Sequence, residues 1–335
     1  MKNITRREAL ARLGGGVAAA LMGLAPGAPG AAPRRSVTVA TLVGPGKPET
    51  RMWYFIRDRI EAKLPGRFQF RIVPNAVLAA GEKEIAEGVR LGSIQAGVNT
   101  TAAFGGWSPR TQILDLPFLF RDREHLQSAL SGELGESLKV ALGDEGFVTL
   151  AYVNFGVRYL MAKERIITPA GLAGKRVRSI PNPVHTEMWK AFQAQPVTLP
   201  IAETYNALKT GVADAMDLNK SAYAALKLYE VAPCLMETAH IWASGVVYVA
   251  AGFWRKLDDE EKAVFSEAAV EGAKHFDELI VEDEAVAVEE ARKAGGEIVP
   301  VEDRRPWEDA ARKVWEIFAP RLGGLERIAA IHEAR

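Results

Sequence analysis

The feature that most constrains the fold is a regular alternation of short apolar strands with amphipathic helices. Strands are predicted at Val37–Val43, Phe68–Val73 and Ile94–Asn99, with helices near Thr50–Lys63 and Glu82–Leu91 between them. Strand and helix in turn are typical of a mostly parallel sheet with helices on its faces. The sequence therefore predicts an α/β fold, with a ligand cleft at the carboxyl ends of its strands.

The same alternation resumes in the second half of the 335-residue chain, which is long enough for two domains. The further strands are predicted at Val148–Val153, Arg176–Ile180, Val197–Leu199, Ala213–Leu218 and Val246–Ala251. The helices between them are expected near Val184–Gln193, Thr204–Thr210 and Tyr223–Tyr229. A long amphipathic helix, bent or broken at some point, then begins at a capping box formed by Asp258 and Glu261, and Gly295-Gly296 ends it.

Residues 1–32 are predicted to be an export signal. A basic start is followed by the apolar run Leu13–Leu24 and by small residues at Ala28–Ala32 that suit a cleavage site. The run is shorter than the roughly 20 residues of a membrane span. The adjacent Arg6 and Arg7 favour the twin-arginine route over a Sec signal that carries two arginines. The protein is therefore expected in the periplasm, without stable insertion into the membrane.

Charge and composition argue against several classes of protein. Four of the 42 basic and one of the 42 acidic side chains lie in residues 1–32, so the remainder has three more acids than bases. This balance gives no support to nucleic-acid binding. The five histidines are far apart, and no nucleophile, phosphate-loop or dinucleotide motif occurs. No catalysis, cofactor or metal site is therefore predicted. The single cysteine, Cys234, is expected to be a buried apolar side chain, and Asp214 and Asp217 are expected to be solvated.

Several motifs follow one another in a specific order. They are Leu91–Val98, Leu114–Phe120, Asn154–Arg158, Leu172–Arg178, Ile180–His185, Glu203–Asp214 and Lys227–Val231. Together they resemble the substrate-binding proteins of tripartite ATP-independent periplasmic (TRAP) transporters. The likeness is to the C4-dicarboxylate-binding branch and extends from about Val37 to Phe318.

The resemblance implies a two-domain periplasmic binding protein of the type II kind, with a ligand cleft between its lobes and a long C-terminal helical region. Domain I would comprise residues 37–155 plus 244–283, and domain II residues 156–243 plus 284–335. The domains would close on a small organic acid and deliver it to the membrane subunits of a TRAP permease.

The resemblance also implies ligand-binding residues. Arg178 matches the arginine that makes the main two-pronged contact with the ligand carboxylate, a task suited to a planar, permanently charged guanidinium. Arg158 matches a second ligand-binding arginine, and the alternative for it is a structural salt bridge beside the hinge. Glu82 matches an acidic position that faces ligand or water. Thr100 ends the third strand, where the family's pocket lies.

Three positions depart from sialic-acid-binding relatives. Ala103 stands in place of an arginine, Ile201 in place of a pocket phenylalanine, and Leu218 in place of an asparagine, with Asn219 one residue later. Ile201 and Asn219 are included among the candidate ligand-binding residues, and a smaller or more apolar acid than sialic acid is favoured. Two roles are open for three tryptophans: they either line an aromatic pocket or, as is more common, belong to the core. They are Trp107, Trp189 and Trp242.

Two other functions are compatible with the same features. A periplasmic sensor would present the closed, ligand-bound form to a receptor instead of a permease, and it needs the same ligand-dependent surface. An exported enzyme would use the same cleft, but the missing nucleophile and metal motifs argue against it. Transport of an organic acid is the function that the sequence favours.

Overall fold

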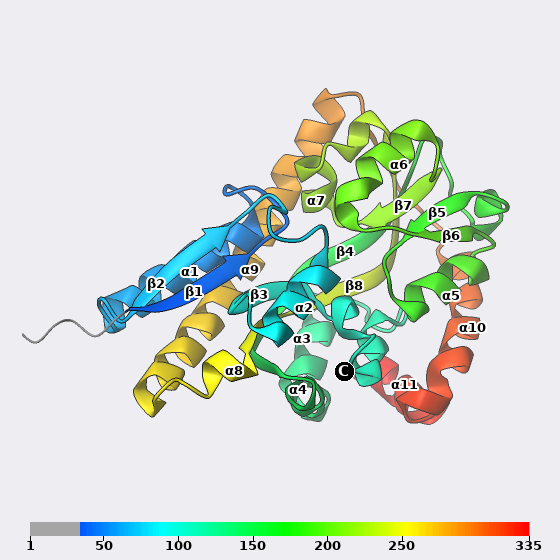
Figure 1. The fold of residues 1–335 in the computed structure, drawn as a ribbon. Helices are drawn as coiled ribbons and strands as arrows, with labels where there is room; N and C mark the ends of the chain where they lie inside the picture. Colours follow the sequence, from blue (N-terminus) through cyan, green and yellow to red (C-terminus); the bar gives the residue numbers. More distant parts are fainter. Residues whose placement is uncertain (1–33, 335) are drawn as a thin grey trace, which may run out of the picture. The chain divides into compact units, whose positions relative to one another are not determined.

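Nine strands form one sheet in the computed structural model, which describes residues 34–334 (Figure 1). The predicted export signal at residues 1–32 lies outside the described residues. The strands are β1 (Arg35–Ala40), β2 (Phe68–Val73), β3 (Ala96–Thr100), β4 (Phe147–Ala162), β5 (Arg176–Ser179), β6 (Gln195–Thr198), β7 (Ala215–Leu218), β8 (Cys234–Ala250) and β9 (Glu297–Val299). Most of the predicted strands are therefore confirmed to within a few residues.

Eleven α-helices pack around the sheet within residues 34–334. They are α1 (Pro48–Lys63), α2 (Glu82–Leu91), α3 (Arg123–Ser131), α4 (Glu133–Asp144), α5 (Pro183–Ala191), α6 (Thr204–Thr210), α7 (Lys220–Ala225), α8 (Ala251–Trp254), α9 (Asp259–Lys293), α10 (Arg305–Leu322) and α11 (Leu325–Glu333). None of these helices combines the length and apolarity that crossing a bilayer requires. The predicted α/β class and the helical C-terminal region are both present.

The sheet is mixed, whereas the sequence predicted a mostly parallel one. Its order is β2-β1-β3-β8-β4-β7-β5-β6, with β9 paired to β8. The two ends of the sheet are parallel, at β1–β2, β1–β3, β5–β6 and β5–β7. The centre is antiparallel, because β4 pairs with β8, β8 with β3, and β4 with β7. The alternation of strand and helix predicted the outer parts correctly and missed the central reversal.

The central strands β4 and β8 are much longer than predicted, at 16 and 17 residues. Their pairing register shifts between Thr149 and Ala151, between Asn154 and Val157, and between Arg158 and Leu160. Such bulges break the two-residue period on which strand prediction depends, so each strand was predicted only in part. The length of β4 and β8 carries them from one parallel end of the sheet to the other.

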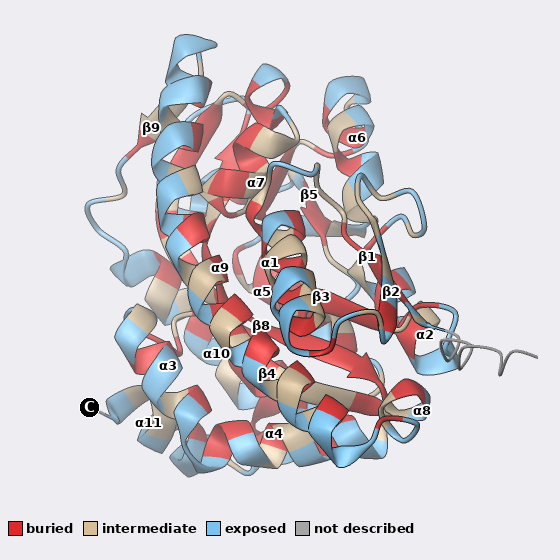
Figure 2. Ribbon diagram, turned by 90° about the vertical axis from the view of Figure 1, so that its left-hand side faces the viewer, coloured by how far each residue is buried: buried red, intermediate tan, exposed pale blue. Residues whose placement is uncertain are grey.

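Three hydrophobic clusters form the core, and Figure 2 shows the buried strands between helices that expose their outer faces. The first cluster joins β1, β2 and β3 to α1 and α9. The second joins α5, α10 and residues 113–138, and the third gathers around α7 and the first part of β8. Helices α1 and α9 pack closely at Gly272, where an added Cβ would lie 2.4 Å from Cγ1 of Ile56.

Helix α9 runs as one unbroken helix over 35 residues, so the expectation of a break within it was wrong. It begins at the predicted capping box. The Asp258 carboxylate accepts from the Glu261 backbone N–H at 2.8 Å, and the Glu261 carboxylate accepts from the Asp258 N–H at 2.9 Å. These bonds satisfy two donors that a helix start otherwise leaves unpaired. The helix ends at Lys293, next to Gly295-Gly296 as predicted.

The cap gives a first prediction. Asp258→Ala removes the acceptor for the Glu261 N–H, so the free energy of unfolding should fall by about 1 kcal/mol in urea denaturation. Glu282→Ala, at an exposed position within α9, is the control and should change the stability much less. Equal effects of the two substitutions would show that the cap contributes nothing specific.

Candidate functional site

A cavity of about 490 Å³ lies among the ends of the sheet strands. It is lined by all six residues that the sequence proposed as ligand-binding: Arg178, Arg158, Glu82, Thr100, Asn219 and Ile201. Ala202 also lines it, and the backbone N–H of this residue donates to the carbonyl of Ala80 at 3.4 Å. A cavity of this size matches the usual volume of small-molecule sites.

The strand ends explain how residues distant in sequence meet at the cavity. Thr100 is the last residue of β3, and Asn219 follows β7 directly as the N-cap of α7. Ile201 lies in the short 3₁₀ helix after β6, and Arg178 lies one residue before the end of β5. Because β3, β5, β6 and β7 all end at the cavity, it occupies the position at the strand ends that the sequence predicted.

Arg178 is 2% exposed, and its guanidinium is only partly hydrogen-bonded. Its Nε donates to the Leu199 carbonyl at 3.0 Å, whereas its Nη1 has no hydrogen-bond partner among residues 34–334. Burial, together with the nearby charge of Arg158, lowers the pKa of Arg178 to about 10. Buried donors without a partner are rare in proteins, so Nη1 of Arg178 is a donor that remains available within the cavity.

Arg158 has a buried anionic partner instead. Its Nε donates to the Asp217 carboxylate at 2.5 Å, and its Nη2 donates to the Asp217 carbonyl at 3.0 Å. Asp217 is fully buried on β7, inside the sheet, so the prediction that it is solvated was wrong. Burial favours its neutral form, but the charge of Arg158 and hydrogen bonds from His240 and Arg158 hold its pKa well below the usual range.

A chain of hydrogen bonds ends at the same Asp217 oxygen, Oδ2, that accepts from Nε of Arg158. The Leu160 N–H donates to Oγ1 of Thr238 at 3.1 Å, and Thr238 Oγ1 lies 2.8 Å from Nδ1 of His240. Nε2 of His240 lies 3.1 Å from the Asp217 carboxylate. Burial lowers the pKa of His240, so the ring is neutral and its Nε2–H donates to Asp217. Asp217 is therefore held by two residues of different strands.

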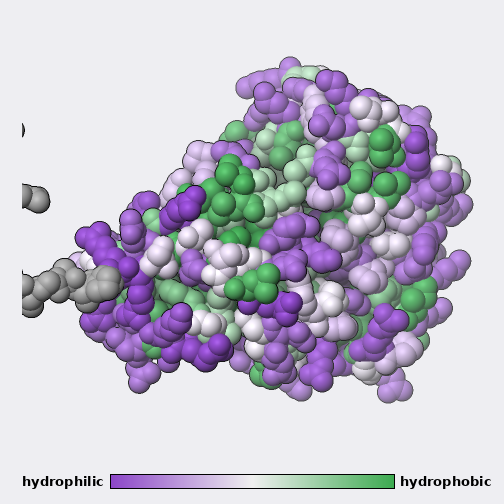
Figure 3. Space-filling view, in the orientation of Figure 1, coloured by the Kyte–Doolittle hydropathy of each residue, from purple (hydrophilic) through white to green (hydrophobic). Residues whose placement is uncertain are grey.

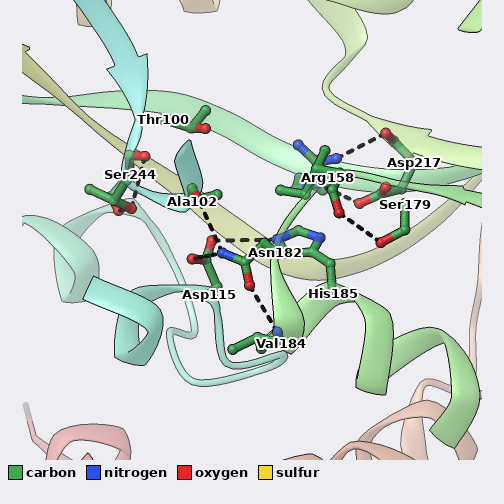
Figure 4. A network of polar contacts seen from close by, with 12 residues as sticks. Thr100, Ala102, Asp115, Arg158, Ser179, Asn182, Val184, His185, Asp217 and Ser244 are labelled. Atoms are coloured by element: carbon green, nitrogen blue, oxygen red, sulfur yellow. Dashed lines mark hydrogen bonds and ion pairs between the residues drawn. The ribbon is translucent and has the colours of Figure 1, made fainter. Parts of the chain in front are cut away.

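A second buried network positions the turn after β5, and Figure 4 shows it beside the Arg158–Asp217 pair. The Asn182 side-chain amide donates to the Ala102 carbonyl at 3.1 Å and to the Asp115 carboxylate at 3.0 Å. Its carbonyl oxygen accepts from the Val184 N–H at 2.8 Å, which caps α5. Asn182 thus ties the end of the Arg178 strand to the segment that follows Thr100.

Two carboxyl groups line the cavity from the side of α1 and α2. Glu82 accepts from the Thr100 N–H at 2.7 Å and from the Thr100 hydroxyl at 2.5 Å. Burial raises the pKa of Glu82, despite these bonds and the two arginines. Burial also raises the pKa of Glu49 to about 8, with a further increase from the charge of Glu82. Glu49, which lies in the first turn of α1, was not predicted.

The rest of the cavity wall is largely apolar. Figure 3 shows hydrophobic side chains gathered in the middle of the face that carries β1 and β2 on one side and α6 and α7 on the other. The apolar lining includes Leu42, Ala102, Phe155, Leu199, Leu218 and Leu226. Within the described residues none of Trp107, Trp189 and Trp242 lines this cavity, and Trp189 is fully buried in the second cluster.

Among residues 34–334 neither a metal-binding group nor a reactive thiol occurs at the cavity. Residues 34–334 contain no group of three or more side chains that could hold a metal ion. Cys234 is buried, as predicted, and burial raises the pKa of its thiol. The site as described offers guanidinium, carboxyl and hydroxyl groups in an apolar cavity, which suits binding of a polar small molecule.

Comparison with known proteins identifies the family. A model described as bacterial extracellular solute-binding protein, family 7, matches residues 39–321. The chain belongs to this family. Its members are binding proteins, so this protein is an extracellular solute-binding protein and not an enzyme, as the sequence predicted.

Two relatives are similar to this chain over most of its length. The 2,3-diketo-L-gulonate-binding periplasmic protein of Escherichia coli is 28% identical over 83% of this chain and 85% of that protein. The C4-dicarboxylate-binding periplasmic protein DctP of Rhodobacter capsulatus is 26% identical over 96% of this chain and 97% of that protein.

Two solved TRAP periplasmic solute-binding proteins share the fold. The protein of a Polaromonas species, with bound D-erythronate, is 27% identical with a TM-score of 0.86 over 90% of this chain and 99% of that one. The protein of Roseobacter denitrificans, with bound β-D-glucuronate, is 26% identical and has a TM-score of 0.85. The match covers 89% of this chain and 99% of that one. The TRAP resemblance and the fold class predicted from the sequence are confirmed.

The buried ion pair gives a second prediction. Asp217→Asn removes the carboxylate that is hydrogen-bonded to Arg158 in the interior, so the free energy of unfolding should fall by about 3–5 kcal/mol. Asp214→Asn is the matched control, because Asp214 forms a partly exposed ion pair with Arg176 and should change stability by less than about 1 kcal/mol. Chemical denaturation of both variants measures the difference, and equal losses would contradict a special role for the buried pair.

Proposed function

We propose that the cavity captures an organic carboxylate and that Arg178 is its main anchor. The observation that carries this proposal is the unpaired Nη1 of Arg178, which lies within a cavity and has no acceptor among residues 34–334. Arg158 is already paired with Asp217, so Arg178 provides the cationic donor for a ligand. Arg158 lines the cavity too and is proposed as the second contact.

The strength of such a contact fits a binding protein. A charged hydrogen bond contributes about 1.5–3 kcal/mol, and micromolar affinity corresponds to about 8 kcal/mol. The arginine therefore anchors the ligand, and the remainder comes from the apolar wall and from polar contacts. Thr100 and Asn219 are proposed to contact polar groups of the ligand, and Ile201 its apolar part.

The proposed ligand class agrees with the acids that the relatives bind. D-Erythronate, β-D-glucuronate and 2,3-diketo-L-gulonate, which the similar proteins bind, each carry a carboxylate. In this proposal the closed protein delivers its acid to the membrane subunits of a TRAP permease. That partnership follows from the family and is a proposal for this chain.

We propose that two lobes close around the ligand, divided as the sequence predicted except at residues 113–138. The predicted division has residues 37–155 plus 244–283 in one lobe and 156–243 plus 284–335 in the other. The first hydrophobic cluster supports this division, because its members come from residues 37–155 and 243–280. The segment 113–138 packs instead in the second cluster, so the proposal moves that segment to the second lobe. Strands β4 and β8 would then connect the lobes and bend at the bulges near Asn154.

Replacing the proposed anchor should separate binding from folding. Arg178→Gln removes a buried charge that no carboxylate of residues 34–334 neutralises through a salt bridge, so the unliganded protein should keep its unfolding temperature. Its affinity for acids should fall about 100-fold, or ~3 kcal/mol, in calorimetric titration with D-erythronate, D-glucuronate and succinate.

Arg176→Gln is the matched control for this experiment. Arg176 lies on the same strand two residues earlier, is exposed, and forms an ion pair with Asp214. Its replacement should leave affinity unchanged. Retained affinity in Arg178→Gln, or an equal loss in the control, would remove Arg178 from the proposed role.

We further propose export to the periplasm by the twin-arginine route, on the basis of Arg6 and Arg7. Replacing both with lysine should leave a reporter fusion of residues 1–40 in the cytoplasm, whereas the native leader should export it. Fractionation of cells measures the outcome. Export of the native fusion in cells lacking the twin-arginine machinery would contradict this route and favour the Sec pathway.

A further inference from the structure

A second group of charged side chains lines the cavity beside the proposed carboxylate anchor. Glu49 lies in the first turn of α1 and Glu82 is the first residue of α2, so both come from the α1 and α2 side. Arg178 comes from β5. The charged side chains that line the cavity are Glu49, Glu82, Lys83, Glu84, Arg158 and Arg178, of which Lys83 and Glu84 are exposed at its rim.

Thr100 holds Glu82 in a fixed orientation, and the Glu82 carboxylate can accept further hydrogen bonds. One of its oxygens accepts from the Thr100 N–H and the other from the Thr100 hydroxyl. An ionised carboxylate has about four acceptor sites, so two remain for a ligand. Within residues 34–334 neither Glu49 nor Glu82 forms a salt bridge with a basic side chain.

The two carboxyl groups influence each other. Burial raises the pKa of both, and the charge of Glu82 raises that of Glu49 further, to about 8. Loss of hydration is the main cause of both shifts, although the charges of Arg158 and Arg178 lower the pKa of Glu82. Removal from water disfavours any carboxylate in this part of the cavity. A ligand group that brings more negative charge here is disfavoured, and one that brings a donor is favoured.

We propose that Glu49 and Glu82 set the ligand class, selecting an acid with one carboxylate at Arg178 and a hydroxyl or ammonium donor where the ligand reaches α1 and α2. A second carboxylate at that end is rejected. This inference rests on the proposed function, because it requires that a carboxylate occupies the Arg178 side of the same cavity.

The preference for a monocarboxylate follows from the surroundings of Glu49 and Glu82. Apolar side chains such as Leu42 and Phe155 line the cavity and cannot offset a third carboxylate. Like charges in a water-poor cavity interact more strongly than in bulk water. A hydroxyl or ammonium instead donates to an acceptor site of Glu82 that Thr100 leaves free. The specificity therefore comes from repulsion of the wrong ligand as much as from attraction of the right one.

Matched ligands test this proposal by calorimetric titration of the full mature protein. Succinate, 4-hydroxybutyrate and 4-aminobutyrate share four carbons and one carboxylate and differ only in the group at the other end. D-Glucarate and D-gluconate form a second pair of open-chain acids, which differ only in that one terminal carboxylate is replaced by a hydroxymethyl group. Titrations at pH 8.5, above the pKa of Glu49, keep that carboxyl ionised.

The expected result is that in each set a monocarboxylate binds at least tenfold more tightly than the dicarboxylate. The preference should shrink at pH 6.5, because Glu49 then takes up a proton. The hydroxy and amino members of the four-carbon set distinguish a hydroxy acid from a zwitterion as the preferred class.

Variants test whether Glu49 and Glu82 cause the preference for monocarboxylates over dicarboxylates. The double substitution Glu49→Gln with Glu82→Gln keeps the size of both side chains and removes their charge, so the ratio of the two affinities should move towards one. Glu87→Gln, at an exposed position on the same helix as Glu82, is the matched control and should preserve the ratio. Thermal unfolding of each variant verifies that it is folded.

The outcomes separate this inference from the proposed function. If the dicarboxylates bind as tightly as the matched monocarboxylates, the inference is overturned, whereas the proposed role of Arg178 is not affected. An unchanged ratio in the folded double variant would overturn the assignment to Glu49 and Glu82. Failure of every acid to bind the folded wild-type protein would contradict the proposed function itself.

Discussion

The arrangement of charges in the cavity depends on the buried ion pair between Arg158 and Asp217. Two guanidinium groups line one cavity, and their charges repel each other. Asp217 neutralises Arg158, and His240 and Thr238 hold Asp217 in place. The pair leaves Arg178 as a buried cation whose Nη1 has no partner among residues 34–334, a state that favours an anionic ligand. A buried pair of this kind contributes less to stability than its attraction suggests, because both charges lose their hydration. Its value here is that it determines which arginine is available.

The mixed sheet places these groups together. Arg158 lies on β4 and Asp217 on β7, which are antiparallel neighbours, whereas Arg178 lies on β5, the next strand. Strands β3, β6 and β7 bring Thr100, Ile201 and Asn219 to the same cavity from their ends. The long strands β4 and β8 connect the two parallel ends of the sheet, so the cavity is built by both. Such an arrangement lets a ligand contact residues from both ends at once.

Much of the site was predictable because strand ends and matching motifs place residues without any knowledge of packing. Arg178, Thr100 and Asn219 are of this kind, and all three line the cavity. The burial of Asp217 was not predictable, because its partners Arg158 and His240 are distant in sequence and become neighbours only through the pairing of β4 with β7 and β8. The bulges in β4 hid the length of the central strands, since they interrupt the alternation of inward and outward side chains. Glu49 was missed because a single acid in the first turn of a helix is usually a favourable charge at the helix start and needs no ligand.

The most direct measurement is a crystal structure of the protein with its acid bound, obtained by soaking or from ligand that co-purifies with the protein. The account predicts that a carboxylate oxygen of the ligand accepts a hydrogen bond from Nη1 of Arg178, while Arg158 keeps its contact with Asp217. A ligand carboxylate bound elsewhere, with Nη1 of Arg178 directed away from it, would contradict the central claim.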